Sequence, residues 1–125
     1  MNEAALVGRL LKKLRTSYPK AVVIKHADRI TSGIPDISIS WHGKTTWLEV
    51  KFANPNIIDR GIQRLMLKTL EREGSAFYVI YDNLRNRTLI VLPQHIDRWE
   101  DDGAYRDADG FDHDLVVKLI KETHS

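Results

Sequence analysis

The pattern of hydrophobic and polar positions between residues 33 and 52 predicts two short strands joined by a tight turn. Successive residues of a strand point to opposite faces of a sheet, so alternating apolar and polar residues indicate a strand with one buried face. A turn at His42-Gly43 makes the apolar faces of the two strands coincide. The polar face of the pair then carries Asp36, Glu49 and Lys51 together. The apolar positions are Ile37, Ile39 and Trp41 in the first strand and Leu48, Val50 and Phe52 in the second.

Two turn lengths are compatible with this pattern. A two-residue loop pairs Trp41 with Lys44 and sets Asp36 opposite Glu49, whereas a four-residue loop sets Asp36 opposite Lys51. Both keep the three ionisable groups on one side of the sheet, with directly opposed side chains ~5 Å apart.

The rest of the chain alternates between helical and strand patterns, which predicts an α/β fold with a mixed sheet flanked by helices. Because a helix separates the strand of Glu49 from the next strand, we expect a right-handed crossover between parallel neighbours. Besides the strand pair above, we expect helices at residues 2–17, 56–73, 94–100 and 115–123, and strands at 21–26, 76–81 and 88–92.

The predicted helix at 56–73 has an apolar stripe that we expect to be buried, with a row of basic residues beside it. The row is either a solvated face or a contact surface for phosphates. Residues 101–114 are predicted to form a solvated acidic loop and not a second metal site. The stripe consists of Ile58, Ile62, Leu65, Met66, Thr69 and Leu70, and the row of Arg60, Arg64 and Lys68.

Composition sets limits on the class of protein. A chain of 125 residues predicts a single domain spanning 1–125. The formal charge of +2 is small, so any affinity for DNA has to come from local patches. There is no cysteine, no apolar run of ~18 residues and no signal-peptide pattern, which predicts a cytoplasmic protein without a membrane anchor.

The polar face of the strand pair suggests a particular chemistry. Carboxylate oxygens are hard ligands that suit Mg²⁺ or Mn²⁺. Such an ion lowers the pKa of a bound water and offsets charge on a phosphoryl oxygen, and a nearby lysine either orients that water or neutralises the transition state. Asp36, Glu49 and Lys51 therefore indicate hydrolysis of phosphodiester bonds.

The same residues belong to an ordered motif that resembles the PD-(D/E)XK nuclease superfamily. Over about residues 25–80 the pattern is similar to virus-type replication-repair nuclease (VRR-NUC) domains. It departs from them at Arg60, where the family often has serine. The motif consists of Gly33-x-Pro35-Asp36, then Glu49-x-Lys51 thirteen residues after the aspartate, then Gln63 and finally Gly74 at the end of a helix.

The resemblance implies a restriction-endonuclease-like fold with element order αβββαβ and a metal-dependent endodeoxyribonuclease. It implies a stand-alone phage-type member that acts as a homodimer on branched DNA. Glu3 is explained either by the favourable position of an acid near a helix N-terminus or by metal binding. The implied metal ligands are Asp36, Glu49, the Val50 carbonyl and Glu3, and the implied catalytic residues are Asp36, Glu49, Lys51 and Gln63.

Three alternatives stay open at this point. One is a nuclease for linear or single-stranded DNA in replication or repair. Another is a DNA-binding module of the same fold without catalysis, although such a module is expected to have lost one of the three ionisable residues. The third is a protein-interaction domain in which these residues form a surface ion pair, and this predicts no effect of metal on stability.

Overall fold

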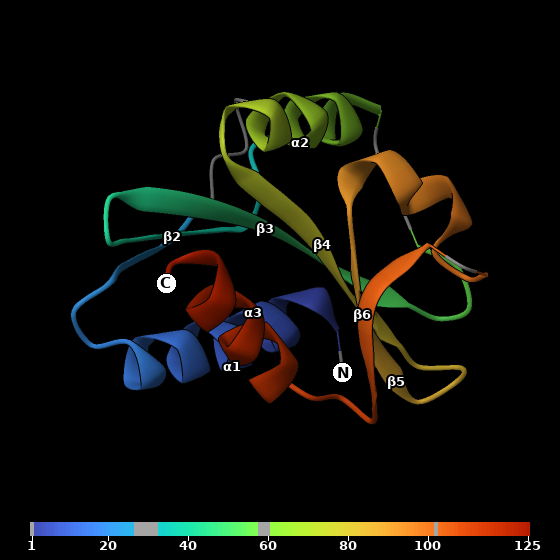
Figure 1. Cartoon of the computed structure of the whole chain (residues 1–125). Coiled ribbons are helices and arrows are strands. Elements are labelled where there is room, and N and C mark those ends of the chain that lie inside the picture. The colour runs from blue at the N-terminus through green and yellow to red at the C-terminus, as the bar shows by residue number, and fades with distance from the viewer. Residues whose placement is uncertain (1, 27–32, 58–60, 102) are drawn as a thin grey trace.

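The computed structural model of the protein describes residues 2–26, 33–57, 61–101 and 103–125. In chain order, the elements are α1 (Glu3–Ser17), β1 (Val22–Lys25), β2 (Ile37–Trp41), β3 (Lys44–Ala53), α2 (Gly61–Glu73), β4 (Ser75–Asp82), β5 (Arg87–Val91), the 3-10 helix η1 (Pro93–Arg98), β6 (Ala104–Asp109) and α3 (Asp114–Thr123). They build a six-stranded sheet in the order β1-β2-β3-β4-β5-β6 (Figure 1). The αβββαβ order expected from the sequence is confirmed.

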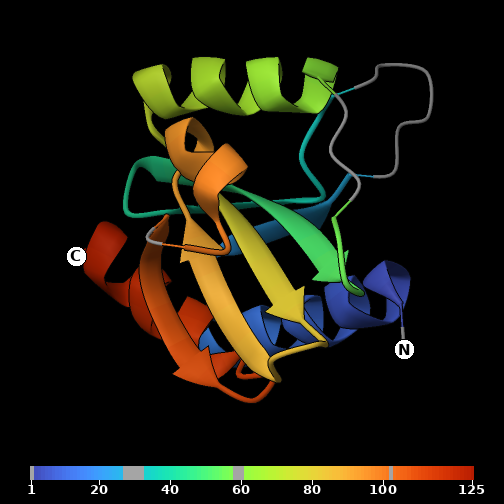
Figure 2. The ribbon, with the colours of Figure 1, turned by 90° about the vertical axis from the view of Figure 1, so that its right-hand side faces the viewer.

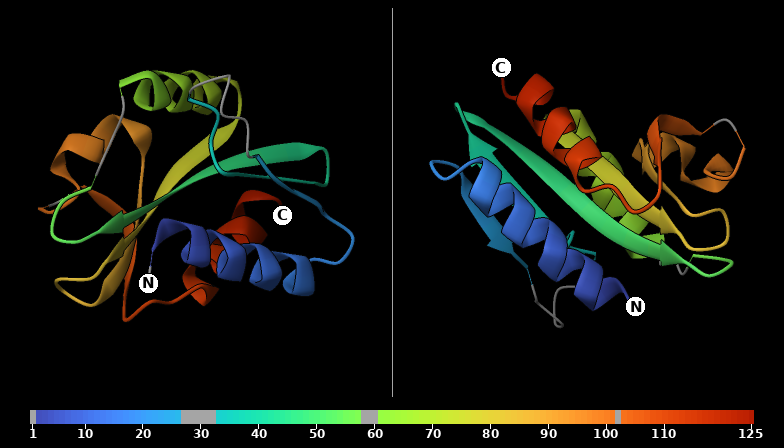
Figure 3. Two further views of the ribbon diagram at one scale, coloured as in Figure 1. Left: turned by 180° about the vertical axis from the view of Figure 1, so that it is seen from behind. Right: turned by 90° about the horizontal axis from the view of Figure 1, so that it is seen from below.

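Helices cover both faces of the sheet. α2 lies over one face, while α1 and α3 lie next to each other on the opposite face (Figures 2 and 3). β3 and β4 are parallel and are connected through α2, which confirms the parallel pairing expected from the sequence. The other neighbouring strands are antiparallel. Within the described residues, no helix has the length and apolar character needed to cross a bilayer.

The β2–β3 turn has the shorter of the two predicted loops. Trp41 pairs with Lys44, and the turn residues His42 and Gly43 have φ values of 53° and 76°. Two successive positive φ values match the twist of a two-residue hairpin, and glycine adopts such a value without steric cost. The register continues to Ile37 opposite Leu48, so the polar face of the hairpin is the one predicted.

Apolar residues fill both sides of the sheet. On the α1 and α3 side, the alternate residues of β2 and β3 pack against a leucine stripe of α1. On the α2 side, residues of β4 and β5 pack around Leu67 and Trp99. Residues Ala76–Asp82 of β4 are buried throughout, as expected for a strand covered on both faces.

The predicted buried stripe of α2 is wrong at Ile62 and Leu65. Leu67 is the fully buried residue of this helix, whereas Ile62 and Leu65 are 50% and 66% exposed. Met66, Thr69 and Leu70 are half-buried, and Ile58 lies outside the described residues. The sheet face beneath the start of α2 is polar, because it carries Lys51. The helix therefore turns Gln63 toward the sheet and leaves Ile62 outside.

The predicted acidic loop is also wrong over part of its length. Residues 104–109 form β6, which pairs with β5 at the edge of the sheet. Exposed and half-buried residues alternate along it. Charged side chains are common on edge strands because they discourage pairing with another chain. The sequence does not show this alternation as an apolar–polar pattern, because Tyr105 is on the exposed side and Arg106 on the half-buried side.

Candidate active site

Asp36 lies against the edge of β3. β2 pairs with β3 from Lys44 to Leu48, and beyond that point the same edge of β3 bonds to side chains. The Val50 amide donates to Asp36 Oδ2 at 2.8 Å, and the Asp36 amide donates to Glu49 Oε1 at 3.2 Å. These two bonds hold the carboxyl groups of Asp36 and Glu49 beside each other.

Glu3 reaches the same edge from the first turn of α1. The Phe52 amide donates to Glu3 Oε1 at 3.2 Å. Residues 50 and 52 point their amides to the same side and are ~6.6 Å apart, so Asp36 and Glu3 lie along one edge. The carbonyl of Val50 points to that side too, since the N–H and C=O of a strand residue share a direction.

Lys51 lies between Glu49 and Gln63. Its Nζ is 3.3 Å from Glu49 Oε2 and donates to Gln63 Oε1 at 2.9 Å. Both charged residues are buried, with 3% of Glu49 and 4% of Lys51 exposed. The catalytic residues expected from the sequence are thus brought together by β3, the approach to β2, and α2.

The two carboxyl groups are electrostatically crowded. Burial, reinforced by the neighbouring Asp36, raises the pKa of Glu49 to about 8. Burial likewise raises the pKa of Asp36, although the Val50 amide and Lys51 oppose the shift. The positive charge of Lys51, joined at Asp36 by that of Lys25, therefore offsets the cost of burying the two carboxylates only in part.

The donor set fits a divalent cation. Asp36 and Glu49 offer carboxylate oxygens, which Mg²⁺ and Mn²⁺ prefer, and a cation between them would offset the negative charge that burial disfavours. Glu3 lies at the same edge of β3, farther along it, at the Phe52 amide. Among the described residues, no three His, Asp or Glu side chains are gathered closely enough to hold one ion.

Gly33 explains how the loop before Asp36 meets α2. Its φ is +97°, and a Cβ added there would lie 2.8 Å from the carbonyl oxygen of Ile62. Glycine permits both the backbone conformation and this close approach. The contact ties the loop that carries Asp36 to the turn of α2 that carries Gln63.

The basic row expected on α2 is not a uniform surface. Arg60 lies outside the described residues. The Arg64 Nη1 atom is 2.8 Å from an oxygen of Asp97, so Arg64 also ties α2 to η1. Lys68 is exposed.

His26 is a neighbour of the site that sequence reasoning did not select. Its amide donates to the carbonyl of Asp36 at 2.8 Å, and its ring Nε2 is 2.8 Å from Ser38 Oγ. The ring packs on Trp47, with centroids 5.2 Å apart. Its place beside Asp36 and Ser38 follows from the antiparallel pairing of β1 with β2, whose register the sequence pattern does not specify.

Comparison with solved structures defines the fold. Hjc, a Holliday junction resolvase from Archaeoglobus fulgidus, superimposes with a TM-score of 0.61 over 95% of this chain and 98% of its own. The chain has the restriction-endonuclease-like fold. Sequence identity to Hjc is 16%, so this likeness concerns the fold. No family model matches the chain, and no curated protein matches it.

The expected fold of PD-(D/E)XK nucleases is therefore confirmed through the likeness to Hjc. Membership of the VRR-NUC group and a phage-type origin stay predictions. The likeness extends over 95% of this chain and concerns the fold, so the roles of the candidate residues stay predictions.

Proposed function

We propose that this chain is a Mg²⁺- or Mn²⁺-dependent endonuclease that hydrolyses phosphodiester bonds of branched DNA. The observation that carries the proposal is the buried contact of Lys51 with both Glu49 and Gln63, beside Asp36. The whole of residues 1–125 is the nuclease unit. The ordered motif from Gly33 to Gln63 supports a VRR-NUC assignment. A phage-type member that acts in the cytoplasm is the form of this nuclease that we propose.

Each site residue has a distinct role in this proposal. Asp36, Glu49 and the Val50 carbonyl would hold the cation, and Glu3, which accepts from the Phe52 amide farther along the same edge of β3, would have to move closer to join them. When bound, the cation lowers the pKa of a water and offsets charge on the phosphate. Glu49 must lose its proton to bind, so loading of the site releases protons.

Lys51 and Gln63 act on the reacting groups. The ammonium of Lys51 stabilises the charge that develops on the phosphate oxygens during attack by water. Its bond to Gln63 Oε1 holds the ammonium in place and leaves the amide nitrogen of Gln63 to orient a nucleotide or the water. Both groups are positioned before substrate arrives, which lowers the cost of reorganisation in the transition state.

The Hjc fold supports branched DNA as the substrate, because Hjc is a Holliday junction resolvase. A four-way junction is resolved by two cuts related by approximate twofold symmetry, so a homodimer with two sites suits it. The exposed Ile62 and Leu65 on α2 offer an apolar surface for a second copy. Cleavage of linear or single-stranded DNA is the alternative.

Cleavage of defined substrates tests the proposal. A four-way junction, a flap, a linear duplex and a single strand are each incubated with Mg²⁺, Mn²⁺ or EDTA, using wild type and Lys51→Ala. We expect metal-dependent cutting of the junction that is lost in Lys51→Ala. Preferential cutting of the linear or single strand would establish the alternative nuclease. Tight junction binding without cutting would indicate a non-catalytic module.

A further inference from the structure

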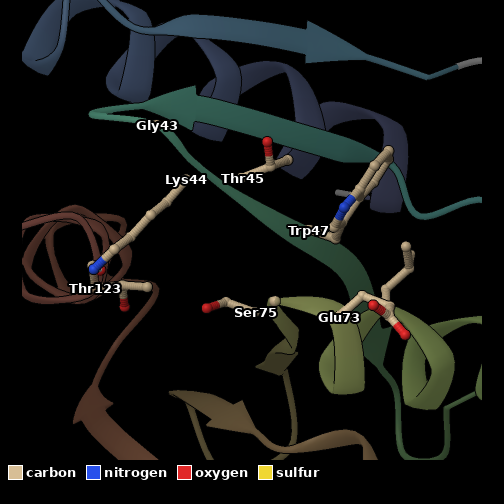
Figure 4. A pocket seen from close by; sticks show the side chains of 9 residues that line it. Gly43, Lys44, Thr45, Trp47, Glu73, Ser75 and Thr123 are labelled. Carbon is tan, nitrogen blue, oxygen red and sulfur yellow. The ribbon is translucent and has the colours of Figure 1, made fainter.

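A cavity of about 540 Å³ lies between the β2–β3 turn, the C-terminal end of α2 and the C-terminal end of α3 (Figure 4). Its size is within the ~300–1,000 Å³ typical of small-molecule sites. Nothing in the proposed catalytic chemistry uses it. The side chains that matter for the argument are Lys44, Thr45, Trp47, Glu73, Ser75 and Thr123.

Trp47 connects this cavity to the catalytic face of the sheet. It precedes Glu49 by two residues on β3, so the two side chains share a face and their Cα atoms are ~6.6 Å apart. The ring of His26 packs on Trp47, and His26 is itself held by Ser38. A half-buried aromatic ring is therefore held in a set orientation between the catalytic carboxyl groups and the cavity.

The polar groups of the cavity have both signs. Lys44 Nζ is 3.3 Å from the Thr123 carbonyl oxygen, which uses one of its three donors. The carboxylate of Glu73 lies on another wall, where it would repel a phosphate. A nucleobase matches this lining better, because it has a flat face for stacking and an edge with both donors and acceptors.

We propose that this cavity binds an unpaired nucleobase of the DNA strand being cut, stacked on Trp47, within a few nucleotides of the scissile phosphate. The inference rests on the proposed nuclease function and adds a substrate feature to it. A fully paired duplex keeps its bases stacked inside the helix, whereas a branch point supplies bases that leave the stack at lower cost. The cavity would thus favour branched substrates.

The fluorescent base 2-aminopurine tests this inference directly. It is placed singly at successive positions on both sides of the cut in the junction, and binding is followed in EDTA, so that no cleavage occurs. We expect a change of fluorescence at one or two adjacent positions with wild type. Trp47→Phe keeps the change, whereas Trp47→Leu loses it and binds the junction roughly 5- to 150-fold more weakly.

A charge-matched pair of variants serves as the control. Lys44→Gln and Lys118→Gln each remove one exposed lysine, but Lys118 is on α3 and does not line the cavity. We expect weaker base insertion in Lys44→Gln alone. An unchanged signal in Trp47→Leu, or no position that responds, would overturn the subsite. Cleavage measured on the same junctions distinguishes the nuclease function from the base-binding cavity. A base that enters the cavity in a junction that is never cut would contradict the nuclease function and leave the cavity proposal intact.

Discussion

At the scale of single residues, the buried carboxyl of Glu49 links stability to pH. Its pKa is about 8 in the folded protein against 4.5 for the ordinary group. Between these values the folded chain holds a proton that the unfolded chain has lost, so stability falls as pH rises through this window. Glu49→Gln removes this titration. We expect it to raise the melting temperature in EDTA, by ~4 °C or more at about pH 9 and by little at about pH 5.

The same substitution is expected to reduce metal-dependent cleavage by ~1,000-fold or more, since a ligand that supplies several kcal/mol of charge stabilisation is lost. Thermal denaturation and single-turnover cleavage measure the two effects on one preparation. An equal melting temperature difference at both pH values would contradict the electrostatic account. Undiminished cleavage would remove Glu49 from the mechanism.

Gly33 is a second residue whose role can be measured. Gly33→Ala forces an alanine to φ +97° and brings its Cβ 2.8 Å from the Ile62 carbonyl oxygen. We expect a loss of at least ~1–2 kcal/mol in the free energy of unfolding. We also expect slower cleavage, because the start of α2 must shift and carries Gln63 with it.

Gly8→Ala is the matched control for Gly33→Ala. Gly8 lies within α1, where an added Cβ meets nothing within 4 Å. Alanine is favoured over glycine in a helix by ~0.5–1 kcal/mol, so this variant should be slightly more stable and fully active. Chemical denaturation distinguishes them, and a Gly33→Ala variant as stable and active as Gly8→Ala would show that the close approach is unimportant.

The sequence predicts which site residues share a face of the sheet, because side chains alternate between the two faces along a strand. Asp36, Glu49 and Lys51 share a face for either turn length, since both loops preserve the period of two. The burial of Glu49 and the bond from Lys51 to Gln63 were not predictable in that way. They depend on how α2 lies over the sheet, which is a tertiary contact.

At the scale of elements, α2 shows where pattern reasoning fails. Its apolar stripe is real, but periodicity says which residues share a face and not which neighbour covers that face. Ile62 and Leu65 face outward because Gln63 and Leu67 are drawn to a sheet that is polar at one end and apolar at the other. In β6 the error runs the other way. Its acidic composition is typical of a loop, but its backbone pairs with β5 and forms a strand.

The exposed part of this stripe predicts the oligomeric state. Leu65→Lys is expected to dissociate the proposed homodimer, since a charge in the centre of an apolar contact is costly to bury. Leu84→Lys is the matched control, because Leu84 is 70% exposed in the β4–β5 turn. Sedimentation velocity measures both. A monomeric wild type, or equal behaviour of the two variants, would contradict the dimer.

Arg64 joins α2 to η1 through Asp97, so its part in DNA binding is testable by a paired comparison. We expect Arg64→Ala to weaken binding and to reduce the slope of log K against log salt by about one, as one phosphate contact is lost. Asp97→Ala also breaks the ion pair but keeps the positive charge. If both variants weaken binding alike, Arg64 serves the fold and not the DNA.

At the scale of the whole molecule, the sequence supports the fold because its local signals agree with one another. A hairpin with a two-residue turn, a helical crossover and a continuous apolar strand together leave few arrangements of a mixed sheet. The contacts that complete the site connect α1, the approach to β2, β3 and α2. The sequence alone does not supply their distances, because they depend on how three layers pack.

The convergence of these elements on β3 predicts that metal binding stabilises the entire fold. An ion that binds the folded chain and not the unfolded one adds RT ln(1 + [L]/Kd), or ~2.7 kcal/mol at 100 times Kd. We expect Mn²⁺ to raise the melting temperature of wild type above its value in EDTA. Asp36→Asn should lose this rise, even if relief of repulsion with Glu49 raises its starting temperature.

Asp109→Asn provides the control for charge, because Asp109 is exposed at the end of β6, away from Asp36. It changes the net charge by the same amount and should keep the full response to Mn²⁺. If Mn²⁺ raised the melting temperature of Asp36→Asn as much as that of wild type, Asp36 would not be a ligand of the ion. The absence of any rise in wild type would favour the protein-interaction domain, for which metal has no effect on stability.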